Sequence, residues 1–141
     1  MSRRHRRREA FTLIEVLLVL VILVILGSLV GIQIRRAQKK GLVNAAKSQV
    51  SMFKTPLDMY QLDLGQYPSS SSGLDALRRA PGDVQDTKWA GPYLEKDAPL
   101  DPWGRKYHYA NPGKHNTDGY DLWSSGPDGA DGTDDDVGNW Q

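Results

Sequence analysis

The sequence of 141 residues contains no cysteine, so disulfide bonds and thiol chemistry are both excluded. A small domain that works outside the cytoplasm commonly relies on disulfides to supplement a modest hydrophobic core. Without them, a bound metal ion is the obvious alternative support for the fold. The sequence also has no internal repeat and no linker long enough to separate two folded domains.

Motifs for catalysis are missing as well. The sequence has no phosphate-binding loop and no zinc-ligand spacing, and its serine run at residues 69–72 lacks the G-x-S-x-G context of a hydrolase nucleophile. Of the three histidines, His5 lies in a basic leader, His108 alternates with tyrosines in a predicted strand, and His115 lies in a predicted loop. We therefore expect a protein that is not an enzyme.

A strong net charge is absent too. The formal net charge of +1 gives no support for a nucleic-acid partner. The charge is unevenly distributed, because residues 3–8 read RRHRRR and five aspartates lie within residues 128–136. The cations between residues 35 and 54 are interpreted as a solvated helix face.

Residues 11–32 form a long apolar run in which Glu15 is the only charge. As a helix this run would be about 33 Å long, enough to cross a bilayer core of about 30 Å. A secretory signal peptide usually has a shorter apolar region and a small-residue cleavage site, and the QIRR that follows here is not such a site. A plain membrane anchor explains the length but leaves the carboxylate of Glu15 without a partner.

The order of arginine-rich leader, Ala10, Phe11-Thr12-Leu13-Ile14-Glu15 and apolar run resembles the processing signal of type IV pilins and type II secretion pseudopilins. The resemblance implies cleavage by a prepilin peptidase between Ala10 and Phe11, and methylation of the new amino terminus. Residues 1–10 would be a cytoplasmic leader, residues 11–34 a transmembrane and assembly helix, and residues 35–141 a periplasmic globular domain. The family usually has glycine before the cut and often proline at the position of Ile32, and this chain has neither.

Cleavage before Phe11 would place a cationic amine four residues before Glu15, on the same helix face. In a helical filament, the Glu15 carboxylate can meet the Phe11 amine of its own chain or of a neighbour. Glu15 is therefore predicted to act in assembly, because a buried carboxylate penalises the wrong register between packed subunits. The alternative is an ordinary anchor with an acidic residue near its end.

Beyond the apolar run, a helical pattern continues as far as Gly65 and Pro68. Pro56 is expected to kink this helix or to start a new turn, with Thr55 as a candidate cap. Residues 73–79 are expected to form a short helix, and residues 105–110 and 119–126 two antiparallel strands. The apolar positions of the long helix are spaced for packing on a sheet: Ala46, Val50, Phe53, Leu57, Tyr60 and Leu64. The expected fold class is α+β, with a pilin-like long amino-terminal helix packed on a small antiparallel sheet.

The acidic end of the chain, residues 124–140, allows two interpretations. Five aspartates within nine residues repel one another, which favours a disordered acidic tail. Hard oxygen ligands in a glycine-rich loop suit Ca²⁺, although the spacing is not that of an EF-hand. Trp123 and Trp140, on either side of the loop, favour a chain end that is docked on the fold.

The second half of the chain resembles the major pseudopilins of type II secretion. The resemblance rests on LDMYQLDLGQYP, GLDAL, GPYLEKDAPLDPWGRKYHY and YDLWSSGPDG…DDDVGNW. It implies a C-terminal loop that binds Ca²⁺, with Asp131 and Asp134 as candidates for the outer shell. The ligands that the resemblance implies are the side chains of Asp128, Asp135 and Asp136 and the backbone carbonyls of Ser125 and Val137.

The resemblance further implies that the chain is the major subunit of a periplasmic filament that helps to move folded proteins through the outer membrane. Its partners would be other copies of itself, minor pseudopilins, the inner-membrane assembly platform and the prepilin peptidase. It would be a single-pass inner-membrane protein with its globular domain in the periplasm. Two alternatives stay open: a type IV pilin for adhesion or motility, and an anchored, calcium-stabilised binding domain that never polymerises.

Overall fold

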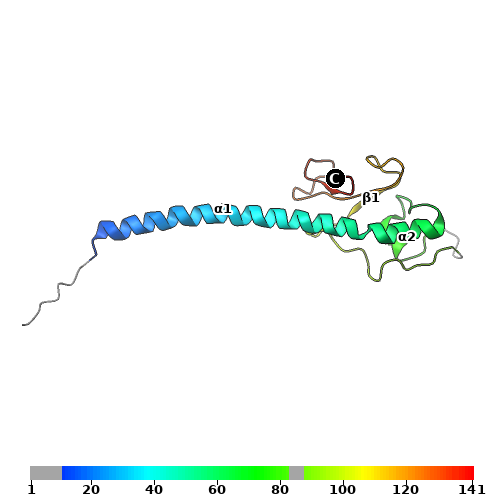
Figure 1. Cartoon of the computed structure of the whole chain (residues 1–141), viewed down its shortest axis with the longest axis horizontal. Helices are drawn as coiled ribbons and strands as arrows, with labels where there is room; N and C mark the ends of the chain where they lie inside the picture. The colour runs from blue at the N-terminus through cyan, green and yellow to red at the C-terminus, as the bar shows by residue number, and fades with distance from the viewer. Residues whose placement is uncertain (1–10, 83–87) are drawn as a thin grey trace, which may run out of the picture. The chain divides into compact units, whose positions relative to one another are not determined.

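The computed structural model describes residues 11–82 and 88–141, apart from the side chain of Ile32. The chain divides into two compact units, Met1–Gln38 and Lys39–Gln141, and the division falls within the first helix. The sequence predicted a boundary between the transmembrane helix and the globular domain at residue 35. That boundary is defined by the membrane span and not by compactness, so it stays a prediction. The elements are, in order, helices α1 (Leu13–Met52) and α2 (Lys54–Leu64), 3-10 helix η1 (Gly73–Leu77), and strands β1 (His108–Ala110), β2 (Asp121–Ser124) and β3 (Val137–Gly138). Figure 1 labels α1, α2 and β1.

In the first unit, α1 begins with a side-chain cap. The backbone N–H of Glu15 donates to the hydroxyl oxygen of Thr12 at 3.3 Å, and the N–H of Val16 donates to the carbonyl of Thr12 at 3.3 Å. Thr12 and Glu15 have the spacing of a capping box, and a carboxylate in the first turn is favoured by the helix dipole. Glu15 thus has a local role that the sequence interpretation above did not include.

The same part of α1 exposes its large apolar side chains. Their exposed fractions run from 47% at Ile22 to 86% at Leu13. Its most apolar window of 18 residues has a mean hydropathy of 3.1 and no buried part, and by length and composition the helix can cross a membrane. Such a surface is unfavourable in water, so it requires an apolar environment.

In the second unit, the long helix is interrupted at Phe53, between α1 and α2. Pro56 has no N–H to donate to the carbonyl four residues earlier, at Met52, which confirms the predicted break. The prediction of Thr55 as the cap was wrong. Phe53 keeps a helical conformation and its carbonyl accepts the N–H of Leu57 at 3.0 Å, so α2 begins at Lys54 and Thr55 lies inside its first turn. Gly65 ends α2 in a left-handed conformation with φ 77°, as expected of a helix stop.

The core of the second unit joins the helices to the sheet. The predicted apolar stripe is confirmed, since five of its positions are buried and Leu64 is partly buried against them. Edge-to-face aromatic contact links the layers, with the rings of Phe53 and Tyr107 centred 5.6 Å apart. The buried cluster consists of Val50, Phe53, Leu57, Tyr60, Ala76, Leu77, Tyr107, Tyr120 and Leu122.

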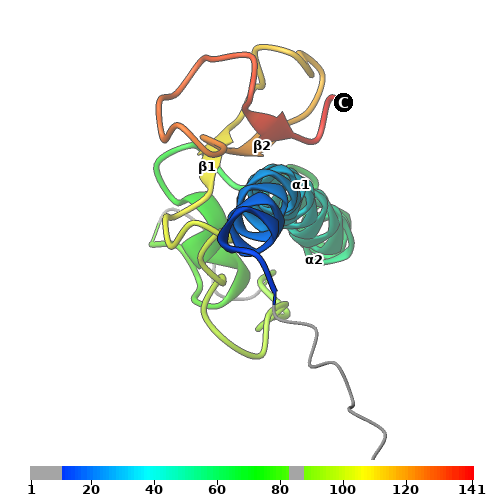
Figure 2. The ribbon, with the colours of Figure 1, turned by 90° about the vertical axis from the view of Figure 1, so that its left-hand side faces the viewer.

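The sheet has three antiparallel strands in the order β1-β2-β3. Figure 2 shows the strands side by side, with the C-terminus next to β3. The predicted hairpin is confirmed, but its strands are shorter than predicted, because the N–H of Asp101 donates to the carbonyl of Arg105 in a turn just before β1 and Gly126 turns the chain after β2. The predicted helix at 73–79 is a 3-10 helix that ends at Leu77. Strand β3, which lies inside the acidic segment, was not predicted.

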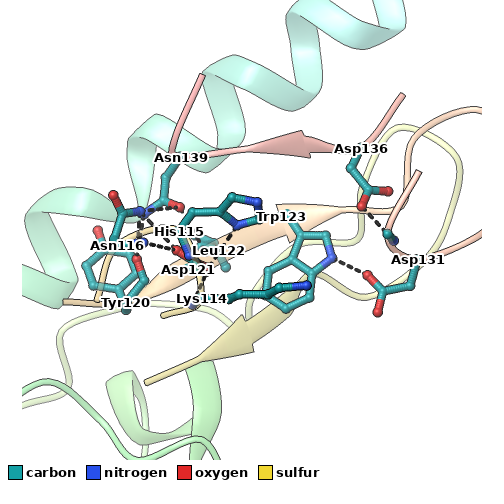
Figure 3. A network of polar contacts seen from close by, with 11 residues as sticks. Lys114, His115, Asn116, Tyr120, Asp121, Leu122, Trp123, Asp131, Asp136 and Asn139 are labelled. Carbon is teal, nitrogen blue, oxygen red and sulfur yellow. Dashed lines mark hydrogen bonds and ion pairs between the residues drawn. The ribbon is translucent and has the colours of Figure 1, made fainter. Parts of the chain in front are cut away.

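Asp121, the first residue of β2, is a buried centre of polar contacts (Figure 3). One carboxylate oxygen accepts the backbone N–H groups of Lys114 and His115 at 2.7 and 2.8 Å, and the other accepts that of Asn116 at 3.0 Å. Burial raises the pKa of the Asp121 carboxyl, but these donors outweigh burial and its pKa is lowered from 3.8. The carboxylate therefore closes the hairpin loop between β1 and β2.

Asp121→Asn is expected to destabilise the second unit by about 1–3 kcal/mol near neutral pH, because backbone donors lose their charged acceptor. A folded pKa below the unfolded one gives stability that is complete above the unfolded pKa and is lost as pH falls through the folded pKa. Calorimetry of the full chain in detergent micelles should therefore show a smaller gap in melting temperature between wild type and variant at about pH 3 than at about pH 7.

The control is Asp118→Asn, which changes an exposed carboxylate of the same loop and should leave the melting temperature unchanged. A gap of equal size at both pH values would contradict the charged role of Asp121.

Candidate functional site

The acidic segment is a closed loop between two paired strands. Ser124 of β2 is paired with Val137 of β3, so Ser125 and Val137, the two predicted main-chain ligands, lie at the base of the loop. The chain end is docked beyond it, with the rings of Trp140 and His115 stacked at 3.9 Å. The disordered acidic tail is therefore ruled out in favour of the docked end.

Asp128 and Asp135 come together across this loop. The backbone N–H of Asp128 donates to a carboxylate oxygen of Asp135 at 3.2 Å, and the other oxygen of Asp135 accepts the hydroxyl of Thr133 at 2.6 Å. The hydroxyl of Thr133 is the main reason that the pKa of the Asp135 carboxyl is lowered. Asp128 itself accepts the N–H of Ala130 at 2.8 Å. The ionised form of the Asp135 carboxyl is thus stabilised beside the backbone of Asp128.

Asp136 differs from its neighbours because it is buried, with 8% of its surface exposed. One carboxylate oxygen accepts the N–H of Gly132 at 2.8 Å, whereas the other is buried and has no hydrogen-bond partner within the described part of the chain. A buried polar atom without a partner costs about 1–3 kcal/mol. An oxygen in this condition fits a cation as its missing partner.

Asp131 and Asp134 are not equivalent. Asp131 accepts the indole N–H of Trp123 at 2.6 Å, which ties the loop to the sheet (Figure 3). Asp134 is exposed. The Trp123–Asp131 contact was missed by the sequence interpretation, and no spacing rule would have found it, because it joins a strand to a loop of irregular backbone.

Across residues 11–82 and 88–141, no three or more His, Asp or Glu side chains are gathered in a form that could hold a metal ion. The predicted set includes three such side chains, Asp128, Asp135 and Asp136, and the structure does not gather their carboxylates in that form. The structure brings all five residues into one loop, and their role as ligands stays a prediction.

The predicted processing and assembly residues lie at the start of the first unit. Ala10 is outside the described residues, and Phe11 is 81% exposed. Glu15 is exposed, and among the described residues its carboxylate makes no hydrogen bond or ion pair. The side chain is therefore held only through the backbone of the first helical turn and is accessible to a partner.

Comparison with known proteins gives matches along nearly the whole chain. The family model described as "Type II secretion system (T2SS), protein G" matches residues 33–140, and that described as "Prokaryotic N-terminal methylation motif" matches residues 5–31. The chain is 40% identical to the type II secretion system core protein G of Pseudomonas aeruginosa, over 97% of this chain and 98% of that protein. It is 41% identical to the core protein G of Aeromonas hydrophila, over 97% and 95%.

A solved structure is similar as well. The major pseudopilin from the type 2 secretion system of enterohaemorrhagic Escherichia coli is 37% identical, with a TM-score of 0.63. The match covers 74% of this chain and 87% of that chain. The long amino-terminal helix and small antiparallel sheet described above are thus an arrangement shared with that structure.

Proposed function

The chain belongs to the type II secretion system protein G family, and on that premise we propose that it is the major structural subunit of the secretion pseudopilus. The observation that carries the proposal is that one chain combines the methylation motif at residues 5–31 with the protein G match at residues 33–140. In this role the chain polymerises into a periplasmic filament that helps to drive folded proteins through the outer membrane. It is a structural subunit and not an enzyme.

The exposed apolar surface of α1 fits two successive environments. Before assembly it is covered by lipid, with the chain anchored by a single span in the inner membrane. In the filament it is covered by the α1 helices of other copies, which replace lipid without exposing apolar surface to water. Minor pseudopilins and the assembly platform of the inner membrane are the further partners of this transfer.

The relatives reported above are named for type II secretion, so no specific observation favours a type IV pilin. An anchored binding domain that never polymerises is the remaining alternative, and filament formation separates it from the proposal.

Processing precedes assembly in this proposal. A prepilin peptidase cuts between Ala10 and Phe11, which leaves a new amine three residues before Ile14 and four before Glu15. The methylation motif matched at residues 5–31 spans this bond and supports the assignment. Alanine before the cut is small, as is the glycine usual in the family, so the bond remains accessible to the peptidase.

Mass spectrometry of the protein from cells with an active prepilin peptidase should give a chain that begins at Phe11 with a methylated amine. Ala10→Gly should be cut as fast as wild type, whereas Ala10→Leu should block cutting because the larger side chain does not fit beside the scissile bond. An intact chain that begins at Met1 in those cells would refute the assignment.

Glu15 has two candidate roles, and they differ in whether they require a negative charge. As the third helical residue after the cap Thr12, it occupies the acidic position of a capping-box sequence, a position that glutamine can fill as well as glutamate. As a charge in an apolar helix, it pairs with the Phe11 amine of its own chain or of a neighbour, and only a carboxylate can do so. The proposal assigns the second role to assembly.

Glu15→Leu and Glu15→Gln should both insert into the membrane and be cut, and both should give few filaments and little secretion, because the Phe11 amine loses its charged partner. Filaments sheared from cells and secreted protein in the medium are the two measurements. Failure of Glu15→Leu alone would assign the residue to capping, and normal filaments from both variants would remove it from assembly.

We also propose that the loop binds Ca²⁺, held by the carboxylates of Asp128, Asp135 and Asp136 and by the carbonyls of Ser125 and Val137. The support is the closed loop, the unpartnered buried oxygen of Asp136 and a donor set made only of oxygen. Like charges at 4 Å repel by about 1 kcal/mol per pair even in water. The ion would convert this repulsion into coordination and would fix the end of a chain that has no disulfide.

The full chain in detergent micelles should melt at a higher temperature with Ca²⁺ and at a lower one with chelator. When the free Ca²⁺ concentration is a hundred times Kd, the free energy of unfolding rises by about 2.7 kcal/mol. Mg²⁺ should raise the melting temperature less than Ca²⁺ does, because Mg²⁺ requires a tighter octahedral site. Asp128→Ala and Asp135→Ala should remove the response, while the control Asp118→Asn keeps it. Identical melting with Ca²⁺ and with chelator would leave the loop as an acidic surface only.

A further inference from the structure

Arg105 lies just before β1 and reaches into the first turn of the acidic loop. Its guanidinium Nη2 donates to the carbonyl of Gly126. The side chain is half-buried, and its Nε lies 3.8 Å from a carboxylate oxygen of Asp101, whose side chain is fully buried. The function described above makes no use of either residue.

Asp101 connects to Gly126 by a second route. One of its carboxylate oxygens accepts the hydroxyl of Ser124 at 2.5 Å, and that hydroxyl oxygen accepts the backbone N–H of Gly126 at 3.2 Å. The other oxygen of Asp101 accepts the backbone N–H groups of Trp103 and Arg105 at 3.0 and 2.8 Å. The N–H of Gly126 is therefore held by the buried Asp101 carboxylate through the hydroxyl of Ser124. The carbonyl of Gly126 is held by Arg105, whose Nε forms an ion pair with Asp101 but no hydrogen bond among the described residues.

The glycines of the loop leave the room that this arrangement needs. Gly126 has φ +60°, and a β-carbon there would overlap the backbone carbonyl of Asp135 on the other side of the loop. Gly129 has φ +73°, and a β-carbon there would overlap Nη1 of Arg105. Gly132 has φ +82° in the same loop, but a β-carbon there would meet nothing within 4 Å. The guanidinium thus occupies the space in front of Gly129.

We propose that Asp101, Ser124 and Arg105 form a clamp on Gly126, and that Arg105 is a positioning residue for the ion-binding loop. The clamp fixes the peptide that follows Ser125, whose carbonyl is a proposed ligand, so the loop is partly ordered before an ion binds. The inference about ion affinity rests on the proposed Ca²⁺ site. The clamp itself rests only on contacts of the chain.

Whether removal of Arg105 strengthens or weakens Ca²⁺ binding distinguishes a role as a clamp from a role as a charge. A cation near the loop repels Ca²⁺, so if Arg105 acted only by charge, its removal would strengthen binding. If it acts as a clamp, its removal weakens binding, and lysine does not replace it, because an ammonium lacks the planar fork of the guanidinium.

The first experiment titrates the full chain in detergent micelles with Ca²⁺ and compares wild type, Arg105→Lys and Arg105→Gln. Both variants should raise the Kd by about tenfold, which corresponds to about 1.4 kcal/mol. Lys106→Gln is the matched control, since it removes the adjacent exposed cation and should leave the Kd unchanged. A wild-type Kd in Arg105→Lys, or tighter binding in Arg105→Gln, would overturn the clamp.

A second readout does not depend on Ca²⁺. The N–H of Gly129 donates to the carbonyl of Ser125 at 3.2 Å within the clamped turn. In chelator its hydrogen exchange should be slow in wild type and in Lys106→Gln, and faster in Arg105→Lys. If wild type does not respond to Ca²⁺ but exchange depends on Arg105, the ion proposal fails and the clamp holds. If exchange is the same in wild type and in Arg105→Lys, the clamp is overturned.

The two glycines test the same contact without removing the arginine first. Gly129→Ala and Gly132→Ala impose similar backbone strain, because both residues have positive φ, but only the former collides with the guanidinium. Gly129→Ala should lower the melting temperature more, and the difference between the two should vanish in an Arg105→Ser background. A difference of equal size in both backgrounds would show that the guanidinium does not lie against Gly129.

Discussion

The apolar surface of α1 between Leu13 and Val30 is the constraint on which the rest of the structure depends. Each Å² of apolar surface left in water costs about 25 cal/mol, and here the large side chains of a whole helical segment are exposed. Only lipid or other apolar helices can cover a surface that faces all directions. The capped first turn at Thr12 and the accessible carboxylate of Glu15 lie at the end of this segment, where a charge costs least in a membrane.

The second unit has to fold in water with a small sheet, and it does so by burying carboxylates. Its strands have three, four and two residues, too few for backbone pairing alone to hold the chain end. Asp121 closes the hairpin loop and Asp101 holds the start of the acidic loop, each through several N–H or O–H donors. In a chain without cysteine, these two buried acids do what cross-links do in other small domains.

The parts of the fold that depend on periodicity could be predicted from the sequence. The apolar stripe, the break that Pro56 imposes and the β1–β2 hairpin follow from spacing and backbone chemistry. Strand β3 could not, because Val137 and Gly138 are too few to form a pattern between Asp136 and Asn139. Of the site, the sequence predicted that the aspartates belong to one loop. It could not predict the clamp, because Gly126 meets Arg105 and Asp101 only through tertiary structure.

The central claim is that α1 packs against the α1 helices of other copies, with Glu15 setting the register. Electron cryomicroscopy of filaments formed by the processed chain tests it most directly. We expect the apolar side chains between Leu13 and Val30 to be buried against neighbouring helices, and the Glu15 carboxylate to lie within hydrogen-bonding distance of a Phe11 amine. Filaments held together by contacts of the second unit alone, with α1 exposed and Glu15 far from every amine, would contradict the account.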